Sequence, residues 1–149
     1  MKNADSEILA LFKHTQPLLL RWSDADALGH INNAVYLTYF EEGRIVYLDR
    51  ILRWDRNQLG MIVAKVTIDF RAPVFYSDKM EIRTRCSRLG SKSLDLEYLL
   101  VRIKNGQPEI VTTGTTVMVI FDYKKNTSVE IPTLAREQLL GYESALQNN

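Results

Sequence analysis

The chain has little cysteine, no excess of charge and no long hydrophobic run. Its one cysteine, Cys86, cannot form an intramolecular disulfide. The 19 basic and 18 acidic side chains give a net charge of +1, which argues against a nucleic-acid-binding protein. No apolar run reaches transmembrane length, and Asp5 and Glu7 lie where a signal peptide would be apolar. We therefore expect a protein of the reducing cytoplasm that does not bind membranes.

The length and the hydrophobic fraction suit one domain. A hydrophobic content of 46% over 149 residues is enough for a buried core. No repeat, low-complexity tract or internal boundary interrupts the sequence. We expect a single domain over residues 1–149, with its core at about 16–123 and short helices at Ser6–Lys13 and Leu134–Leu140.

The most apolar long segment is Ala34–Leu52. It contains no proline and a single glycine, Gly43, which predicts a long helix. Its apolar residues surround most of the circumference, so we expect the helix to be buried. Asn32 and Asn33 precede it and are favoured capping residues. A glycine in mid-helix is unfavourable, so Gly43 indicates close packing against a strand or a partner helix.

The rest of the chain is rich in β-branched residues or alternates apolar and polar residues, which predicts strands. The expected strands are Leu18–Trp22, Met61–Phe70, Met80–Arg88, Leu94–Lys104 and Ile110–Tyr123. Short turns between consecutive strands favour an antiparallel meander, with Asn105–Gly106 as a hairpin turn. We therefore predict an α+β domain whose five- to six-stranded antiparallel sheet wraps around one long central helix. An open sheet has edges that need pairing, which a dimer would provide.

The loop before the helix carries a recognisable motif. The run D-x-D-x-x-G-H-x-N-N-x-x-Y spans Asp24–Tyr36, and Glu41–Arg44 follows as E-E-G-R. This pattern resembles the hotdog-fold thioesterases, in particular the 4-hydroxybenzoyl-CoA thioesterase-like acyl-CoA thioesterases. The order of elements over Leu18–Tyr123 also fits that fold. The resemblance implies hydrolysis of an acyl-CoA, or of an acyl carrier protein thioester, without metal or cofactor. It also implies a homodimer or homotetramer with active sites between subunits.

The resemblance assigns roles to three residues of this loop. Asp26 corresponds to the catalytic carboxylate of that group, acting as general base or nucleophile. Asn33 corresponds to the residue whose backbone N–H polarises the thioester carbonyl. His30 matches the functional histidine of members that carry H-x-N-N. Plant acyl carrier protein thioesterases of this fold also use an asparagine where this chain has Leu28, so their full constellation is absent.

The chemistry of the loop is consistent with those roles. A carboxylate can attack a thioester or activate water, and a helix N-terminus offers unsatisfied N–H groups and a positive pole. His30 could assist proton transfer or orient the carboxylate. Without the motif, Asp26 and Asp24 would be interpreted as turn residues, and His30 as a hydrogen-bonded loop residue. For Asp24 we expect the structural role.

Basic residues near strand ends are candidates for the phosphates of CoA. Arg71, Arg88 and Lys92 are the residues we select, because arginine and lysine are the usual phosphate partners. The alternative for each is ordinary solvent-facing charge. The acidic pair and the histidine of the loop lack a standard zinc spacing, so we expect no metal site.

For two other residues with reactive side chains, Glu42 and Cys86, we expect a structural role and not a catalytic one. Glu42 lies inside the helix, where we expect pairing, although another hotdog subgroup uses a helix carboxylate in catalysis. Glu41 and Arg44 are spaced for an ion pair. Cys86 is expected to be a buried strand residue and not a nucleophile.

Two other functions stay open: a hydratase or dehydratase of this fold, whose motif we do not find, and a non-catalytic module that binds an acyl thioester.

Overall fold

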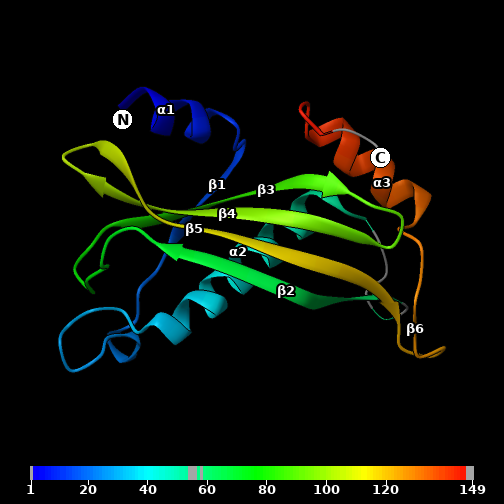
Figure 1. Ribbon diagram of the computed structural model, residues 1–149, viewed down its shortest axis with the longest axis horizontal. Coiled ribbons are helices and arrows are strands. Elements are labelled where there is room, and N and C mark those ends of the chain that lie inside the picture. Colours follow the sequence, from blue (N-terminus) through cyan, green and yellow to red (C-terminus); the bar gives the residue numbers. More distant parts are fainter. Residues whose placement is uncertain (1, 54–56, 58, 147–149) are drawn as a thin grey trace.

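One antiparallel sheet and one long helix form the centre of the molecule (Figure 1). The computed structural model describes residues 2–53, 57 and 59–146. The strands are β1 (His14–Leu18), β2 (Gly60–Phe70), β3 (Met80–Leu89), β4 (Ser93–Lys104), β5 (Gln107–Asp122) and β6 (Thr127–Ser128). The helices are α1 (Lys2–Ala10), α2 (Tyr36–Ile51) and α3 (Thr133–Tyr142), with 3-10 turns η1 (Trp22–Asp24) and η2 (Asn33–Val35). The predicted α+β class is confirmed.

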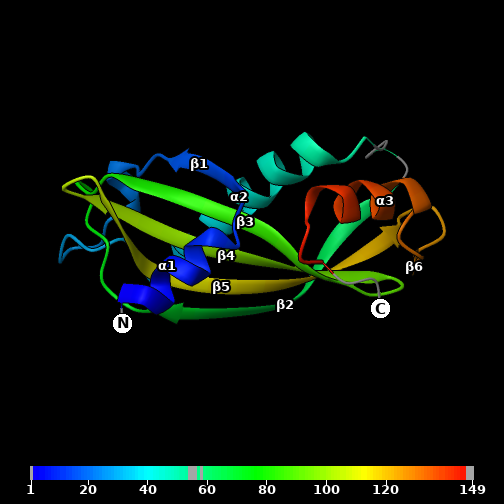
Figure 2. The ribbon, with the colours of Figure 1, turned by 90° about the horizontal axis from the view of Figure 1, so that it is seen from above.

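Helices α1 and α2 lie on opposite faces of the sheet (Figure 2). Side chains alternate between the two faces of a strand, and β4 illustrates this. Leu100 points into the main core with α2, whereas Leu99 and Val101 belong to a second cluster with α1 residues. The central helix therefore lies on the concave face, as expected, and α3 contributes Ala135 and Leu139 to the same core.

Two glycines let α2 approach the sheet closely. A Cβ on Gly43 would lie 2.6 Å from the Ile82 side chain, so the predicted close packing is against strand β3. Further along the sheet, the ring of Phe40 lies over Gly114, where a Cβ would be 2.3 Å from the ring. The same ring stacks on Tyr98 with centroids 4.5 Å apart. These contacts fix the height of α2 above the sheet.

The predicted first strand was placed too late in the chain. We expected Leu18–Trp22, but β1 covers His14–Leu18 and Trp22 begins the turn η1. Pro17 therefore lies inside the strand and pairs with Glu81 of β3. A proline is tolerated there because β1 is at the edge of the sheet, where one side of the strand has no ladder to complete.

The meander prediction is correct for three strands and wrong for the rest of the sheet. Strands β3, β4 and β5 are joined by hairpins, and Asn105 and Gly106 have φ of 53° and 74° at the second of them. Strand β2 is not next to β3, which follows it in sequence. It pairs with β5, at the opposite edge from β1. The strand predicted to be last, β5, is followed by the short β6.

Helix α2 is buried on one face only, which corrects the prediction of burial all round. Tyr39, Phe40 and Tyr47 are at most 1% exposed against the sheet. On the other side, Ile45 and Val46 are 42% and 45% exposed. The apolar circumference therefore exceeds what one sheet can cover. Among the described residues, no helix combines the length and hydropathy needed to cross a bilayer.

Candidate functional site

Asp24 ties the motif loop to α2. Its side chain is buried, and Oδ2 accepts the Tyr39 hydroxyl at 2.8 Å and the Arg21 backbone N–H at 3.0 Å. The Arg21 guanidinium lies 3.0 Å from Oδ1. Burial raises the pKa of the Asp24 carboxyl, but these hydrogen bonds outweigh it and hold that pKa below its usual value. Asp24 therefore has the structural role that we expected.

Asp26 and His30 close a tight turn at the tip of the loop. The Asp26 Oδ1 accepts the backbone N–H groups of Leu28 and His30 at 2.8 and 3.2 Å. The Asp26 N–H donates back to the His30 carbonyl at 2.7 Å. Gly29 has a φ of 82°, which favours glycine at this position. The carboxylate is exposed, and in the described part of the chain its Oδ2 accepts no hydrogen bond.

The chain then enters α2 through a capped 3-10 turn. Asn32 accepts the Ala34 N–H on its side chain at 3.0 Å and the Val35 N–H on its carbonyl at 2.9 Å, so the predicted cap is confirmed for Asn32. The Asn33 N–H donates to no residue that the structure describes. An unpaired N–H group at the positive end of a helix is suited to receive a negatively charged oxygen.

Two hollows flank the loop. The first, of about 640 Å³, is lined by Trp22, Ala25, Asp26, Ala27, Gly29, Phe75, Tyr76 and Ser77. The second, a cleft of about 260 Å³, is lined by His30, Ile31, Asn33, Tyr36, Phe70, Arg71, Ala72 and Pro73. The structure thus brings His30, Asn33 and Arg71 to one cleft. Asp26 instead lines the neighbouring hollow, which includes neither His30 nor Asn33.

The other two predicted phosphate ligands lie elsewhere. Strand β3 begins near the loop and ends at the β3–β4 turn, at the far end of the sheet (Figure 1). Arg88 and Lys92 are at that turn. The Arg88 guanidinium contacts Asp95 at 2.8 Å, and this hydrogen bond raises the pKa of Arg88. Within one protomer, neither residue joins the cleft.

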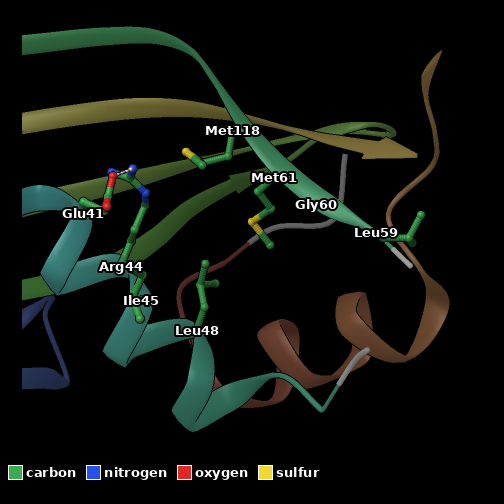
Figure 3. Close-up of a pocket in the computed structure, with 8 residues that line it drawn as sticks. All are labelled: Glu41, Arg44, Ile45, Leu48, Leu59, Gly60, Met61 and Met118. Atoms are coloured by element: carbon green, nitrogen blue, oxygen red, sulfur yellow. Dashed lines mark hydrogen bonds and ion pairs between the residues drawn. The ribbon is translucent and has the colours of Figure 1, made fainter. Parts of the chain in front are cut away.

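A further pocket lies between α2 and the beginning of β2 (Figure 3). Its volume is about 270 Å³, and it is lined by Glu41, Arg44, Ile45, Leu48, Leu59, Gly60, Met61 and Met118. The predicted ion pair between Glu41 and Arg44 is present, at 3.3 Å, on one side of otherwise mostly apolar walls. Sequence reasoning missed this pocket. Its walls come from three distant segments, so no local motif could have indicated it.

The remaining candidates do not join either hollow beside the loop. Cys86 is buried, and burial raises the pKa of its thiol to about 12, as suits a packing residue. Glu42 is exposed on α2. Among the described residues, no three histidine, cysteine, aspartate or glutamate side chains converge on a point where a metal ion could bind.

Comparisons with known proteins show which family the chain and its fold resemble. Residues 20–139 match the family model described as the thioesterase-like superfamily. The chain is 32% identical over 130 residues to the uncharacterised protein YsmA of Bacillus subtilis, covering 87% of this chain and 86% of that one. It is 27% identical to the long-chain acyl-CoA thioesterase FadM of Escherichia coli, covering 76% and 87%. A Thermus thermophilus thioesterase, solved in complex with coenzyme A and Zn, superimposes with a TM-score of 0.77 at 29% identity, covering 90% and 96%.

Proposed function

Because this chain belongs to the thioesterase-like superfamily and has its hotdog fold, we propose that it hydrolyses an acyl thioester to a free acid and a thiol. The thioester is that of CoA or of an acyl carrier protein. Two similar proteins support this choice: the E. coli relative carries the name of an acyl-CoA thioesterase, and the T. thermophilus structure contains coenzyme A.

The observation that carries the proposal is the start of α2. The Asn33 N–H is unpaired among the described residues, and a loop with an exposed carboxylate leads directly to it. When a thioester carbonyl is attacked, negative charge develops on its oxygen. A fixed N–H donor at a helix N-terminus stabilises that charge, and losing one such donor typically costs about 100- to 1000-fold in rate.

We assign the base or the nucleophile to Asp26, which requires the thioester to lie at the turn between the two hollows. Two backbone N–H groups hold its Oδ1, which leaves Oδ2 to take a proton from water or to attack the carbonyl carbon. Water, or the carboxylate itself, adds to the carbonyl carbon, the carbon–sulfur bond breaks and the thiolate leaves. If Asp26 is the nucleophile, water then hydrolyses the acyl-Asp26 anhydride to the free acid. The thiolate takes a proton from His30, which is in the same cleft as Asn33 and regains the proton from solvent.

The substrate would extend in two directions from this point. Arg71 lies at the cleft and suits a phosphate of CoA. The pocket of Figure 3 has the apolar walls that an acyl chain needs. Arg88 and Lys92 are at the far end of the sheet and could contact the substrate of this cleft only from a second protomer.

A second protomer is part of the proposal. Strand β2 is an edge strand, and most of its residues are exposed. Exposed apolar side chains of α2, including Leu37 and Ile45, remain uncovered in the single chain. Pairing of two β2 edges in a homodimer, alone or within a homotetramer, would complete the ladder and cover part of this surface.

Thiol release from a panel of acyl-CoAs tests the activity, with Asp26→Asn against wild type. Asparagine keeps the shape but cannot act as a base or nucleophile, so we expect a loss of about 100-fold or more. The control is Glu137→Gln, which removes an exposed carboxylate of α3, away from the cleft and from β2, and should leave the rate unchanged.

Other outcomes would redirect the assignment. Full activity of Asp26→Asn would remove Asp26 from the mechanism and make Glu42 and His30 the next residues to test. Addition of water to an enoyl-CoA would indicate a hydratase. Binding of every acyl-CoA without turnover would indicate a non-catalytic module.

A further inference from the structure

Helix α1 lies outside the family span and still reaches the candidate site. The family match begins at residue 20, whereas α1 covers Lys2–Ala10. Its contacts are therefore additional to those of the matched domain. One of them is made to Arg71, which lines the cleft that holds His30 and Asn33.

Apolar contacts hold α1 in place independently of its charges. Ile8, Leu9 and Phe12, on and just after the helix, pack on the convex face of the sheet against Leu99, Val101, Ile103 and Ile110 (Figure 2). The Arg85 guanidinium also lies 5.3 Å from the centre of the Phe12 ring. Changing one charged residue near the start of α1 should therefore leave the helix docked.

The contact with the site is a single exposed ion pair. The Asp5 Oδ1 lies 3.2 Å from Nη2 of Arg71, and the two side chains are 39% and 41% exposed. The backbone at Arg71 is held separately, because its N–H donates to the Val111 carbonyl at 2.9 Å. Asp5 is thus not needed to position the main chain of Arg71, and the guanidinium is accessible to other anions.

We propose that Asp5 competes with a phosphate of the CoA substrate for Arg71, and so sets the affinity of the cleft for CoA thioesters. This inference rests on the proposed function. A guanidinium binds a carboxylate and a phosphate with the same planar N–H donors. When the phosphate displaces the weak Asp5 contact, the carboxylate stays nearby on the docked helix and repels it. Asp5 therefore lowers the affinity that Arg71 would otherwise provide.

Steady-state kinetics of Asp5→Asn test this competition. Asparagine removes the charge and keeps the size of the side chain. Because an exposed ion pair is worth little, we expect KM for an acyl-CoA to fall about two- to fivefold with kcat unchanged. The same variant should not change KM for the corresponding acyl-pantetheine, which lacks phosphate. If Asp5 instead held Arg71 in position, KM for acyl-CoA would rise, and the proposal would be overturned.

Two further variants separate this contact from a general effect of charge. Glu7→Gln changes the net charge equally on the same helix, but Glu7 is exposed and does not contact Arg71 in the described structure. It should behave as wild type at moderate salt; an equal fall in KM would refute the specific contact. Arg71→Gln should raise KM for acyl-CoA, and in that background Asp5→Asn should have no effect. A persisting effect would show that Asp5 acts elsewhere.

Direct titration with coenzyme A distinguishes failure of this inference from failure of the proposed activity. If wild type hydrolyses nothing but Asp5→Asn binds coenzyme A about two- to fivefold more tightly than wild type, the competition stands and hydrolysis fails. Equal affinities of the two proteins would overturn the competition. Absence of coenzyme A binding to either protein would overturn it as well.

Discussion

Two buried tyrosines of α2 provide a matched pair for testing how the loop is positioned. The Tyr39 hydroxyl donates to Asp24 at 2.8 Å, and the Tyr47 hydroxyl donates to Glu143 at 2.6 Å. Both rings are at most 1% exposed. Replacement by phenylalanine removes one hydrogen bond to a buried carboxylate in each case. Tyr47→Phe also removes the bond that the hydroxyl oxygen accepts from the Cys86 N–H at 2.9 Å, but this N–H keeps Glu143 as an acceptor at 3.2 Å. Only the Tyr39 bond leads to the motif loop, because Glu143 lies just after α3.

The expected losses of stability are similar and the expected losses of activity are not. A hydrogen bond to a charged group contributes about 1.5–3 kcal/mol, so each variant should lose that much unfolding free energy in urea. The corresponding fall in melting temperature is about 3–12 °C for a chain of this size. Loosening the loop displaces Asp26, so Tyr39→Phe should also lower kcat about tenfold. Tyr47→Phe should keep a kcat close to that of wild type.

The pH dependence of stability gives a second readout for Tyr39→Phe. Although burial raises the pKa of Asp24, hydrogen bonds bring it below its unfolded value of about 3.9. A group with a lowered folded pKa stabilises the fold above its unfolded pKa, and this contribution is lost as the pH falls through the folded pKa. The Tyr39 hydroxyl is one cause of the lowering. The deficit of Tyr39→Phe should thus be full at pH 7 and shrink below about pH 4.

The comparison between the variants decides the outcome. An equal loss of kcat in Tyr39→Phe and Tyr47→Phe would mean that activity follows global stability and not the loop. An unchanged kcat in Tyr39→Phe, despite the expected destabilisation, would mean that the Asp24 anchor does not position the catalytic carboxylate.

Two more variants test packing and assembly. Gly114→Ala would place a Cβ 2.3 Å from the Phe40 ring, which is stacked on Tyr98 and cannot retreat freely. We expect a loss of about 1–3 kcal/mol in urea unfolding, and an unchanged midpoint would show that the ring has room to move. Val66→Lys introduces a charge on the exposed edge strand β2. If two β2 edges pair, light scattering should show dissociation without loss of the fold, because lysine on an edge opposes strand pairing. An intact dimer would exclude this edge.

The local sequence pattern was sufficient to predict the elements whose structure depends on residues close in the sequence. The proline-free apolar segment after Asn32 forms α2, and the Asn105–Gly106 pair forms a hairpin because both residues accept positive φ. It was insufficient for β1, where Pro17 was expected to precede the strand. A proline is compatible with a strand only at a sheet edge, and sheet position is a tertiary property.

In the candidate site, too, some features could be predicted from the local sequence and others could not. The residues between Asp24 and Asn33 are close in sequence, so the turn between Asp26 and His30, the cap and the helix N-terminus could be anticipated from their order. The positions of Arg71 and Arg88 could not. They depend on the length of β3 and on the placement of β2 at the far edge of the sheet, which long-range strand pairing determines.

The sequence by itself determined a long apolar helix preceded by a loop with a carboxylate, a histidine and capping asparagines. Spacing within a few residues sets those features, and they persist wherever the helix packs. Only the tertiary structure decided that Asp5 meets Arg71, that a pocket opens between α2 and β2, and that one side of α2 stays uncovered. The first two features join segments that are far apart in the sequence, and only packing on a common sheet brings such segments into contact. The third depends on how much of α2 the sheet can cover.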